Sequence, residues 1–471
     1  MRSILFLLFF VAVLPTIAFN PFCGILLWSW FSFMSPQRLT YDGTTDMPFA
    51  IVVAIATLIA WSFSREPKRL PADVTLWLIV ALMFWFSLTT VFALVPDLPL
   101  GKWLATCKSL LFVLITAAML TNRVRFHALI WIMVISISFY GLKSGIGTLL
   151  SGGAATAYGP ASTVIADNNH FAVALIVVIP LINYIRLNSQ MKAVRIGAGV
   201  IMGLCLISAF ASYSRGALLG LCGMGVFLWL KSRARVMPAI AIALALSIGL
   251  NFMPERWTER MNSIGTYEED GSAQGRIAMW QASMAIASQR ALGAGFLGPY
   301  NQGVVDNYYP GIKARAVHSI YFEVIGEHGY IGFLLWVLIP ILAWRNGTWI
   351  IRHARQRSDL KWMEDLARML QVSLVGYLVG GAFLSLSYWD FYFTLVAILA
   401  AMRKLAASEI QPLLAPQGSL PVVLKDVPRH PASARRAGQG PAAGRIVGSE
   451  RSKPLTGMDP QTAAASRKSR A

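Results

Sequence analysis

The chain has 471 residues, of which 56% are hydrophobic and only 13% are charged, and its mean hydropathy is +0.57. A soluble domain carries about a quarter charged residues, so this composition excludes an ordinary soluble protein. The 41 Lys and Arg against 22 Asp and Glu give a net charge of +19. In a soluble protein such an excess would indicate nucleic-acid binding, but in a membrane protein it holds cytoplasmic loops inside and contacts anionic lipid. We therefore expect membrane lipids, and no nucleic acid, as partners.

Apolar runs of about 20 residues recur along the chain, and each can cross about 30 Å of hydrocarbon as a helix. The first 34 residues hold one or two crossings, broken at Pro15 and at Asn20–Pro21. We interpret the start as an uncleaved anchor, because the cleavage site of a signal peptide is poorly defined. The predicted fold is an all-α polytopic membrane protein of about 12–13 transmembrane helices with a long, partly helical periplasmic loop. The further spans are expected near residues 47–64, 73–93, 103–120, 128–149, 169–187, 196–213, 216–231, 237–253, 329–345, 367–386 and 388–402.

Basic and cation-free loops alternate along these spans. Loops 94–101 and 150–168 contain no Lys or Arg, whereas the loops that alternate with them along the chain are basic. The positive-inside rule then places the basic loops and the tail in the cytoplasm and residues 254–328 outside, in the periplasm of a bacterial inner membrane. The tail 403–471 is basic and rich in Pro, Ala, Gly and Ser, so we expect it to be disordered. The basic loops contain Arg65, Lys68, Arg69, Arg123, Arg125, Lys192, Arg195, Lys231, Arg233, Arg235, Arg345, Arg352, Arg355, Arg357 and Lys361.

The four cysteines predict no disulfide framework and no metal site. They lie in apolar segments without metal-ligand spacing, which is typical of packing residues. The sequence also shows no Asp-x-Asp pair for a metal-bound nucleotide sugar and no P-loop, and we expect neither a cofactor nor a metal. The cysteines are Cys23, Cys107, Cys205 and Cys222.

The long outer loop 254–328 is a candidate site, since loops of this length are usually functional. Arg276 and Trp280 are four residues apart in a predicted helix and share a face; alternatively, the arginine is an interfacial residue beside an aromatic anchor. His318 stands just before a span and could be a proton acceptor near pH 7 or a surface residue. Glu323 and Glu327, which follow it, could orient a partner or simply be solvated.

Arg215 lies between two apolar runs, where a cation is costly unless it has a partner or water. Its planar guanidinium suits a phosphate, and the functional interpretation is favoured over the structural one. Several other cations are expected at the outer ends of helices, where a positive-inside protein should have few. Together they could form an outward basic funnel for an anionic, lipid-linked substrate. The cations of this predicted funnel are Lys102, Lys108, Lys143, Arg215, Arg276, Lys313 and Arg315.

Three short motifs resemble the O-antigen ligase/polymerase superfamily. They are Ser214-Arg215-Gly216 before a span, Arg276-Ile277-Ala278-Met279-Trp280, and His318-Ser319 near the end of the long loop. The front half, with Gly159-Pro160 and Asp167-Asn168-Asn169-His170, is similar to the exosortase A system-associated O-glycosylation ligases. Asp167 to Asn169 also suit the N-cap of the next helix. The resemblance implies an N-terminal region 1–195, a ligase-like core 196–345, C-terminal helices 346–402 and the tail.

The superfamily resemblance implies a metal-independent glycosyltransferase. Such an enzyme moves a glycan from an undecaprenyl-diphosphate carrier to an acceptor hydroxyl on a protein or another glycan. Arg215 and Arg276 would bind the diphosphate and His318 would activate the acceptor, so these three are the predicted catalytic residues. The further predicted substrate contacts are Trp280, Asn168, Asn169, His170, Tyr321, Glu323 and Arg315.

Two other functions remain open at this point. A lipid-linked glycan transporter would be expected to bury charged residues at mid-membrane, and the sequence indicates essentially none there, with Asp390 and Arg215 near outer ends. A scaffold for an export complex is the other alternative. Ligase and polymerase share the motifs and are not separated by them.

Overall fold

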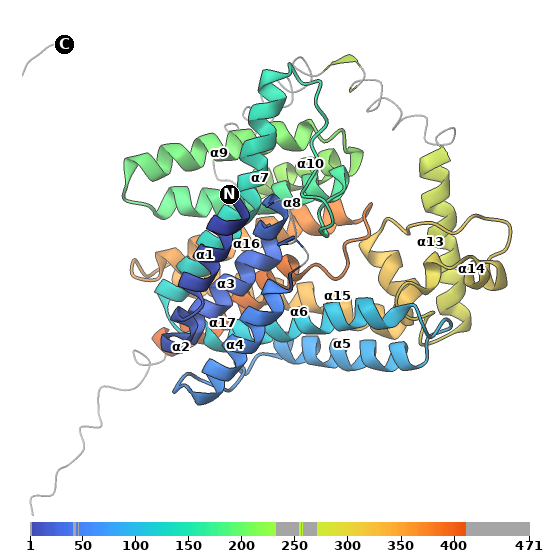
Figure 1. Cartoon of the computed structure of the whole chain (residues 1–471), viewed down its shortest axis with the longest axis horizontal. Helices are drawn as coiled ribbons and strands as arrows, with labels where there is room; N and C mark the ends of the chain where they lie inside the picture. The colour runs from blue at the N-terminus through green and yellow to red at the C-terminus, as the bar shows by residue number, and fades with distance from the viewer. Residues whose placement is uncertain are drawn as a thin grey trace, which may run out of the picture. The chain divides into compact units, whose positions relative to one another are not determined.

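The computed structural model describes residues 2–40, 44–45, 47–231, 254–255, 257 and 271–410. Within these ranges the regular elements are all helical (Figure 1). Eight described helices are long and apolar enough to cross a membrane, and three shorter apolar helices accompany them. The predicted all-α polytopic membrane fold is confirmed. The predicted span 237–253, most of residues 254–270 and the tail from residue 411 lie outside the described residues.

The N-terminal segment breaks where the sequence predicts. It forms α1 (Arg2–Val13), α2 (Thr16–Phe19), α3 (Pro21–Met34) and the 3-10 helix η1 (Pro36–Leu39). The side chain of Asn20 accepts the amide of Phe22 at 3.1 Å, and Pro21 occupies the first turn of α3. Proline fits there because that position needs no amide donor.

The next helices follow the apolar runs, and three of them begin at polar caps. Asp73, Asn122 and Asp167 each accept a backbone amide at the start of α5, α7 and α8, which satisfies donors that a helix start leaves open. The N-cap predicted for Asp167 is therefore present. The helices are α4 (Phe49–Phe63), α5 (Val74–Val91), α6 (Pro99–Met119), α7 (Arg123–Leu150), α8 (Asn168–Asn188), α9 (Lys192–Phe210) and α10 (Arg215–Lys231).

The C-terminal half carries the outer loop and the last helices. It contains α13 (Gly271–Gln289), η2 (Gly298–Tyr300), α14 (Gln302–Tyr308), α15 (Ile320–Ala354), α16 (Lys361–Gly381) and α17 (Asp390–Ile410). Buried α8 packs against α9 and α16, and α10 packs against α16. A Cβ added at Gly220 would lie 3.3 Å from the Cα of Gly380, so small residues let α10 and α16 approach closely.

Helix α15 is interrupted at Gly329, whose φ of 68° and ψ of −177° are not helical. The amides of Ala294 and Gly295 donate to the carbonyls of Gly326 and Glu327 at 2.9 and 2.8 Å. A Cβ at Gly329 would collide with the carbonyl oxygen of Ala291, so this position requires glycine for both its conformation and its space. The break is buried in protein, where non-helical backbone is tolerated within a membrane.

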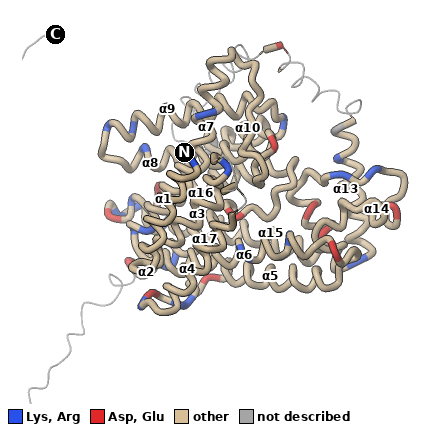
Figure 2. The backbone as a smooth tube through the Cα atoms, in the orientation of Figure 1, with Lys and Arg blue, Asp and Glu red and all other residues tan. Residues whose placement is uncertain are grey.

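Loop charge divides the loops into two predicted sets, one outside and one in the cytoplasm. Several contacts in the structure join loops of the same set. On the set predicted outside, the amide of Leu94 donates to the carbonyl of Ala294 at 3.1 Å, and that of Ala157 to Ala211 at 2.9 Å. On the set predicted inside, Arg125 pairs with Glu66. In Figure 2 the tube along α5 is free of charged residues. Which of the two ends faces the cytoplasm stays a prediction from charge.

Candidate functional site

The three sequence motifs meet at one short segment between α16 and α17, residues 382–387. A Cβ added at Gly216, next to Arg215, would lie 3.3 Å from the Cβ of Phe383. The ring centroids of Phe383 and Trp280 are 6.3 Å apart. The hydroxyl oxygen of Ser385 accepts the backbone N–H of His318 at 2.9 Å. Two residues more than 60 positions from His318 in the sequence thus organise its surroundings, and no sequence pattern singles out Phe383 or Ser385.

His318 has an unusual backbone conformation and an open ring nitrogen. Its φ is 51°, in the left-handed region that residues other than glycine rarely adopt and that is often found at functional sites. Its Nδ1 is buried and makes no hydrogen bond within the described residues. Burial lowers the pKa of His318 below its ordinary value, and the charges of Arg276 and His170 lower it further. The imidazole is therefore neutral at neutral pH and can accept a proton.

Two guanidinium groups lie at the start of α13. Arg276 lies one helical turn before Trp280, whose indole donates to the carbonyl of Val317 next to His318, and its charge lowers the pKa of His318. The guanidinium of Arg315 lies against Gly275, because a Cβ there would collide with its Nη1. Arg315 therefore lies beside the residue that precedes Arg276, and the structure brings both predicted cations to the His318 region. Arg215 is half-buried at the start of α10.

The Asp167–His170 turn joins the same region. Asn168 Nδ2 donates to the carbonyl of Ser212 at 2.7 Å, which ties this turn to the Ser214–Gly216 motif. His170 Nδ1 lies 3.4 Å from Asp167 Oδ1, while its Nε2 is buried without a hydrogen bond within the described residues. Burial opposes the ionisation of Asp167, but hydrogen bonds from His170 and Asn169 hold the pKa of this carboxyl well below its usual range. The site thus contains two half-buried imidazoles with open ring nitrogens.

Trp280 and Tyr321 hold the polypeptide around His318. Trp280 Nε1 donates to the carbonyl of Val317 at 2.9 Å, and its ring stacks on Phe322 with a centroid distance of 5.1 Å. The hydroxyl of Tyr321 donates to the carbonyl of Leu378 at 2.8 Å. These contacts fix the segments on either side of His318, and a direct substrate contact of either side chain stays a prediction.

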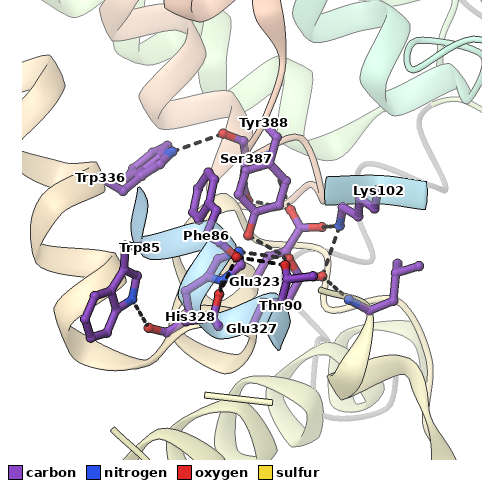
Figure 3. Close-up of polar contacts among 12 residues, drawn as sticks. Trp85, Phe86, Thr90, Lys102, Glu323, Glu327, His328, Trp336, Ser387 and Tyr388 are labelled. Atoms are coloured by element: carbon purple, nitrogen blue, oxygen red, sulfur yellow. Dashed lines mark hydrogen bonds and ion pairs between the residues drawn. The ribbon is translucent and has the colours of Figure 1, made fainter. Parts of the chain in front are cut away.

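A second polar cluster lies beside this site (Figure 3). Lys102 Nζ is 3.1 Å from Glu323 Oε1 and 3.0 Å from Glu327 Oε1, and both carboxylates are buried. Glu323 also accepts the hydroxyl of Tyr300 at 3.1 Å, and Glu327 accepts that of Tyr388 at 2.6 Å and the amide of Leu297 at 2.9 Å. Two side chains of α15 therefore join this helix to three other segments, which are α6, residues 297–300 and residue 388.

This cluster corrects two expectations from the sequence. Lys102 was assigned to an outward basic funnel, which is wrong, because two carboxylates neutralise it. The solvated interpretation of Glu323 and Glu327 is wrong, since their side chains are 3% and 0% exposed. The cluster lies in the first turns of α6 and α15, at the ends predicted outside, so the expectation of essentially no charge at mid-membrane stays a prediction. Lys102 and Glu323 are 221 residues apart, and sequence spacing gives no sign of such a pair.

The other cations of the predicted funnel lie on the surface: Lys108, Lys143, Lys313 and Arg315 are exposed.

Among the described residues, no group of three or more His, Cys, Asp or Glu side chains is placed to hold a metal ion.

Comparison with known families covers most of the chain. Residues 200–337 match the family described as O-Antigen ligase, and residues 1–190 match a family of unknown function, DUF5935. The chain matches no curated protein. The ligase match contains all three motifs that meet near Ser385, whereas the exosortase-associated subgroup stays a prediction. It supports the resemblance to the O-antigen ligase superfamily and indicates a multi-pass membrane protein with glycosyltransferase-type ligase or polymerase activity.

Proposed function

We propose that this protein is a membrane glycan ligase. It transfers an oligo- or polysaccharide from an undecaprenyl-diphosphate carrier to a hydroxyl of a protein or glycan acceptor, on the periplasmic face of a bacterial inner membrane. The observation that carries the proposal is the meeting of the three motifs that contain Arg215, Arg276 and His318 around residues 382–387, within the segment that matches the O-antigen ligase family. Loop charge supports the periplasmic location of this end of the helices and a cytoplasmic tail.

The arginines are suited to the departing diphosphate. Arg215 and Arg276 carry planar guanidinium groups that can each bind phosphate oxygens bidentately. The diphosphate gains negative charge as its bond to the sugar breaks, so fixed cations stabilise the transition state more than the bound substrate. Arg315, on the α13 surface beside Gly275, adds a third cation to this end of the molecule.

His318 supplies the proton acceptor. The acceptor hydroxyl transfers its proton to the neutral imidazole while its oxygen bonds to the anomeric carbon of the donor sugar. The bond from that carbon to the diphosphate oxygen breaks, and the electron pair leaves with undecaprenyl diphosphate. The lowered pKa of His318 keeps the imidazole unprotonated at neutral pH, and its Nδ1 has no hydrogen bond to give up. A polyprenol anchored in lipid keeps the diphosphate at the membrane surface, where these residues lie by the predicted topology.

Transfer by the purified protein tests this proposal. Proteoliposomes with the wild-type protein and the purified lipid-linked donor should release undecaprenyl diphosphate only when an acceptor is present. A deletion strain should accumulate long glycans that are not attached to their acceptor. Single repeat units on the carrier would instead identify a polymerase, and unchanged glycans in the strain together with no transfer in proteoliposomes would refute both.

A further inference from the structure

A cavity of about 260 Å³ borders the segment that holds His318 and lies between α3, α6 and residues 385–390. We propose that it binds one uncharged sugar ring of a glycan substrate, an inference that rests on the proposed transferase function. The donor or the acceptor glycan could supply this ring, and the experiment below separates the two.

The lining suits the hydroxyl groups of a sugar. Thr106 and Ser109 of α6 contribute hydroxyls, and Asp390 and Glu323 contribute carboxylate oxygens. Sugar hydroxyls are both donors and acceptors, and can bond to all of these groups. A lipid acyl chain could form no hydrogen bond with the hydroxyls of Thr106 and Ser109, and a buried hydroxyl without a partner costs several kcal/mol, so hydrocarbon does not suit the cavity. The indole of Trp389, also in the lining, stacks on Phe391 and can offer only its edge to the apolar face of a ring.

The charge of the lining favours an uncharged ligand. Lys102 is the cation of the cavity lining, and Glu323 and Glu327 already neutralise it. An ammonium has three N–H donors, and these glutamates account for two, which leaves one for a sugar oxygen. Asp390, whose carboxylate accepts the hydroxyl of Ser32, adds a further negative group. An acidic sugar or a phosphate would meet net repulsion here, in contrast to the site with Arg215 and Arg276.

The size and place of the cavity fit a single ring next to the reaction centre. Ligand pockets usually have volumes of about 300 Å³ or more, so this smaller cavity holds a small group. Ser385 lines the cavity and also accepts the amide of His318. Glu323 lines it and lies five residues after His318 in the chain. A sugar bound here would therefore contact the residues that position the proposed base.

Two variants test the cavity, each with a control on the same helix. Ala105→Phe fills the cavity, and its control Leu104→Phe alters an exposed neighbour that is not in the lining. Thr106→Val removes one hydroxyl at constant shape, and Thr116→Val does the same at a buried position outside the lining. In proteoliposomes, we expect Ala105→Phe and Thr106→Val to raise the KM of one glycan substrate about tenfold with little change in kcat, while both controls match the wild type. A change in the acceptor KM assigns the ring to the acceptor, and a change in the donor KM assigns it to the donor. Unchanged KM values for both substrates would overturn the proposal.

A binding measurement keeps the cavity testable if no transfer is found. Saturation-transfer NMR of the purified protein would use neutral methyl glycosides of the glycan's own sugars, with glucuronic acid for comparison. The expected result is saturation of a neutral glycoside in the wild type and in Leu104→Phe, its loss in Ala105→Phe, and none for glucuronic acid. Equal saturation in Ala105→Phe, or none in the wild type, would overturn the cavity proposal independently of the enzyme's activity.

Discussion

Replacement of His318 by asparagine separates its chemistry from its backbone role. Asparagine tolerates the left-handed region better than most residues, so His318→Asn should keep the φ of 51° and the amide hydrogen bond to Ser385. The variant loses only the proton acceptor. A general base contributes about 100- to 10,000-fold, which corresponds to about 2.7–5.5 kcal/mol of activation free energy. We therefore expect transfer to fall by at least about 100-fold while the protein level and donor binding stay near normal.

The pH profile provides a second readout for the same variant. Protonated imidazole cannot accept a proton, so wild-type activity should fall on the acid side. Because burial, Arg276 and His170 lower the pKa of His318, this fall should lie below the ordinary histidine value of about 6.5. Initial rates in proteoliposomes from pH 4.5 to 8, with exposed His353→Asn as a matched control, would measure it. A His318→Asn protein that works at the wild-type rate, or keeps the same acid limb, would refute the role of His318.

Four further predictions test the surrounding groups. Arg276→Lys and Arg215→Lys keep the positive charge but lose the planar guanidinium, and each should lower kcat/KM by about 30- to 1,000-fold, or about 2–4 kcal/mol. Normal rates in both variants would show that bidentate binding by the guanidinium is not needed. Trp280→Phe keeps the stack on Phe322 but loses the hydrogen bond to the carbonyl of Val317. Thermal unfolding in detergent should show that the free energy of unfolding falls by about 1 kcal/mol. An unchanged Tm would show that this hydrogen bond does not stabilise the protein. Lys102→Met should destabilise the protein by about 3–5 kcal/mol, because it leaves buried carboxylates unpaired, and adding Glu323→Gln and Glu327→Gln should restore much of the protein level; no loss in the single variant would contradict the ion-pair assignment. In a cysteine-free background, Ser288→Cys should react with an impermeant thiol reagent in spheroplasts and Ser358→Cys should not, and the reverse labelling would invert the topology.

The positions of the helices follow from the sequence because each span must be long and apolar to cross lipid. The predicted spans 73–93 and 169–187 correspond to α5 (Val74–Val91) and α8 (Asn168–Asn188). The prediction for α15 was less accurate: the helix begins at Ile320, whereas the span was expected near residue 329. Residues 320–328 contain two glutamates, and the structure buries both within α15 beside Lys102, a contact that the sequence spacing does not reveal.

The site could be predicted only as separate motifs. Arg215, Arg276 and His318 stand out because a cation beside an apolar run, or a histidine before one, is unusual. Their common neighbours Phe383 and Ser385 belong to a segment with no distinctive chemistry, so only the packing of α10 and α13 onto residues 382–387 identifies it. Likewise, the left-handed conformation of His318 depends on contacts that hydropathy and spacing do not encode.

The interruption of α15 has a mechanical consequence. The carbonyls of Gly326 and Glu327 are bonded to the amides of Ala294 and Gly295, so the first turns of α15 are fastened to the outer segment and not only to the rest of their own helix. If the lipid bilayer changes thickness, we expect the part of α15 after Gly329 to tilt, with the backbone rotation taken up at Gly329, which has no side chain. Ser319, His318 and the glutamates then keep their register relative to α13. One continuous rod would instead transmit every tilt of the membrane to the reaction centre.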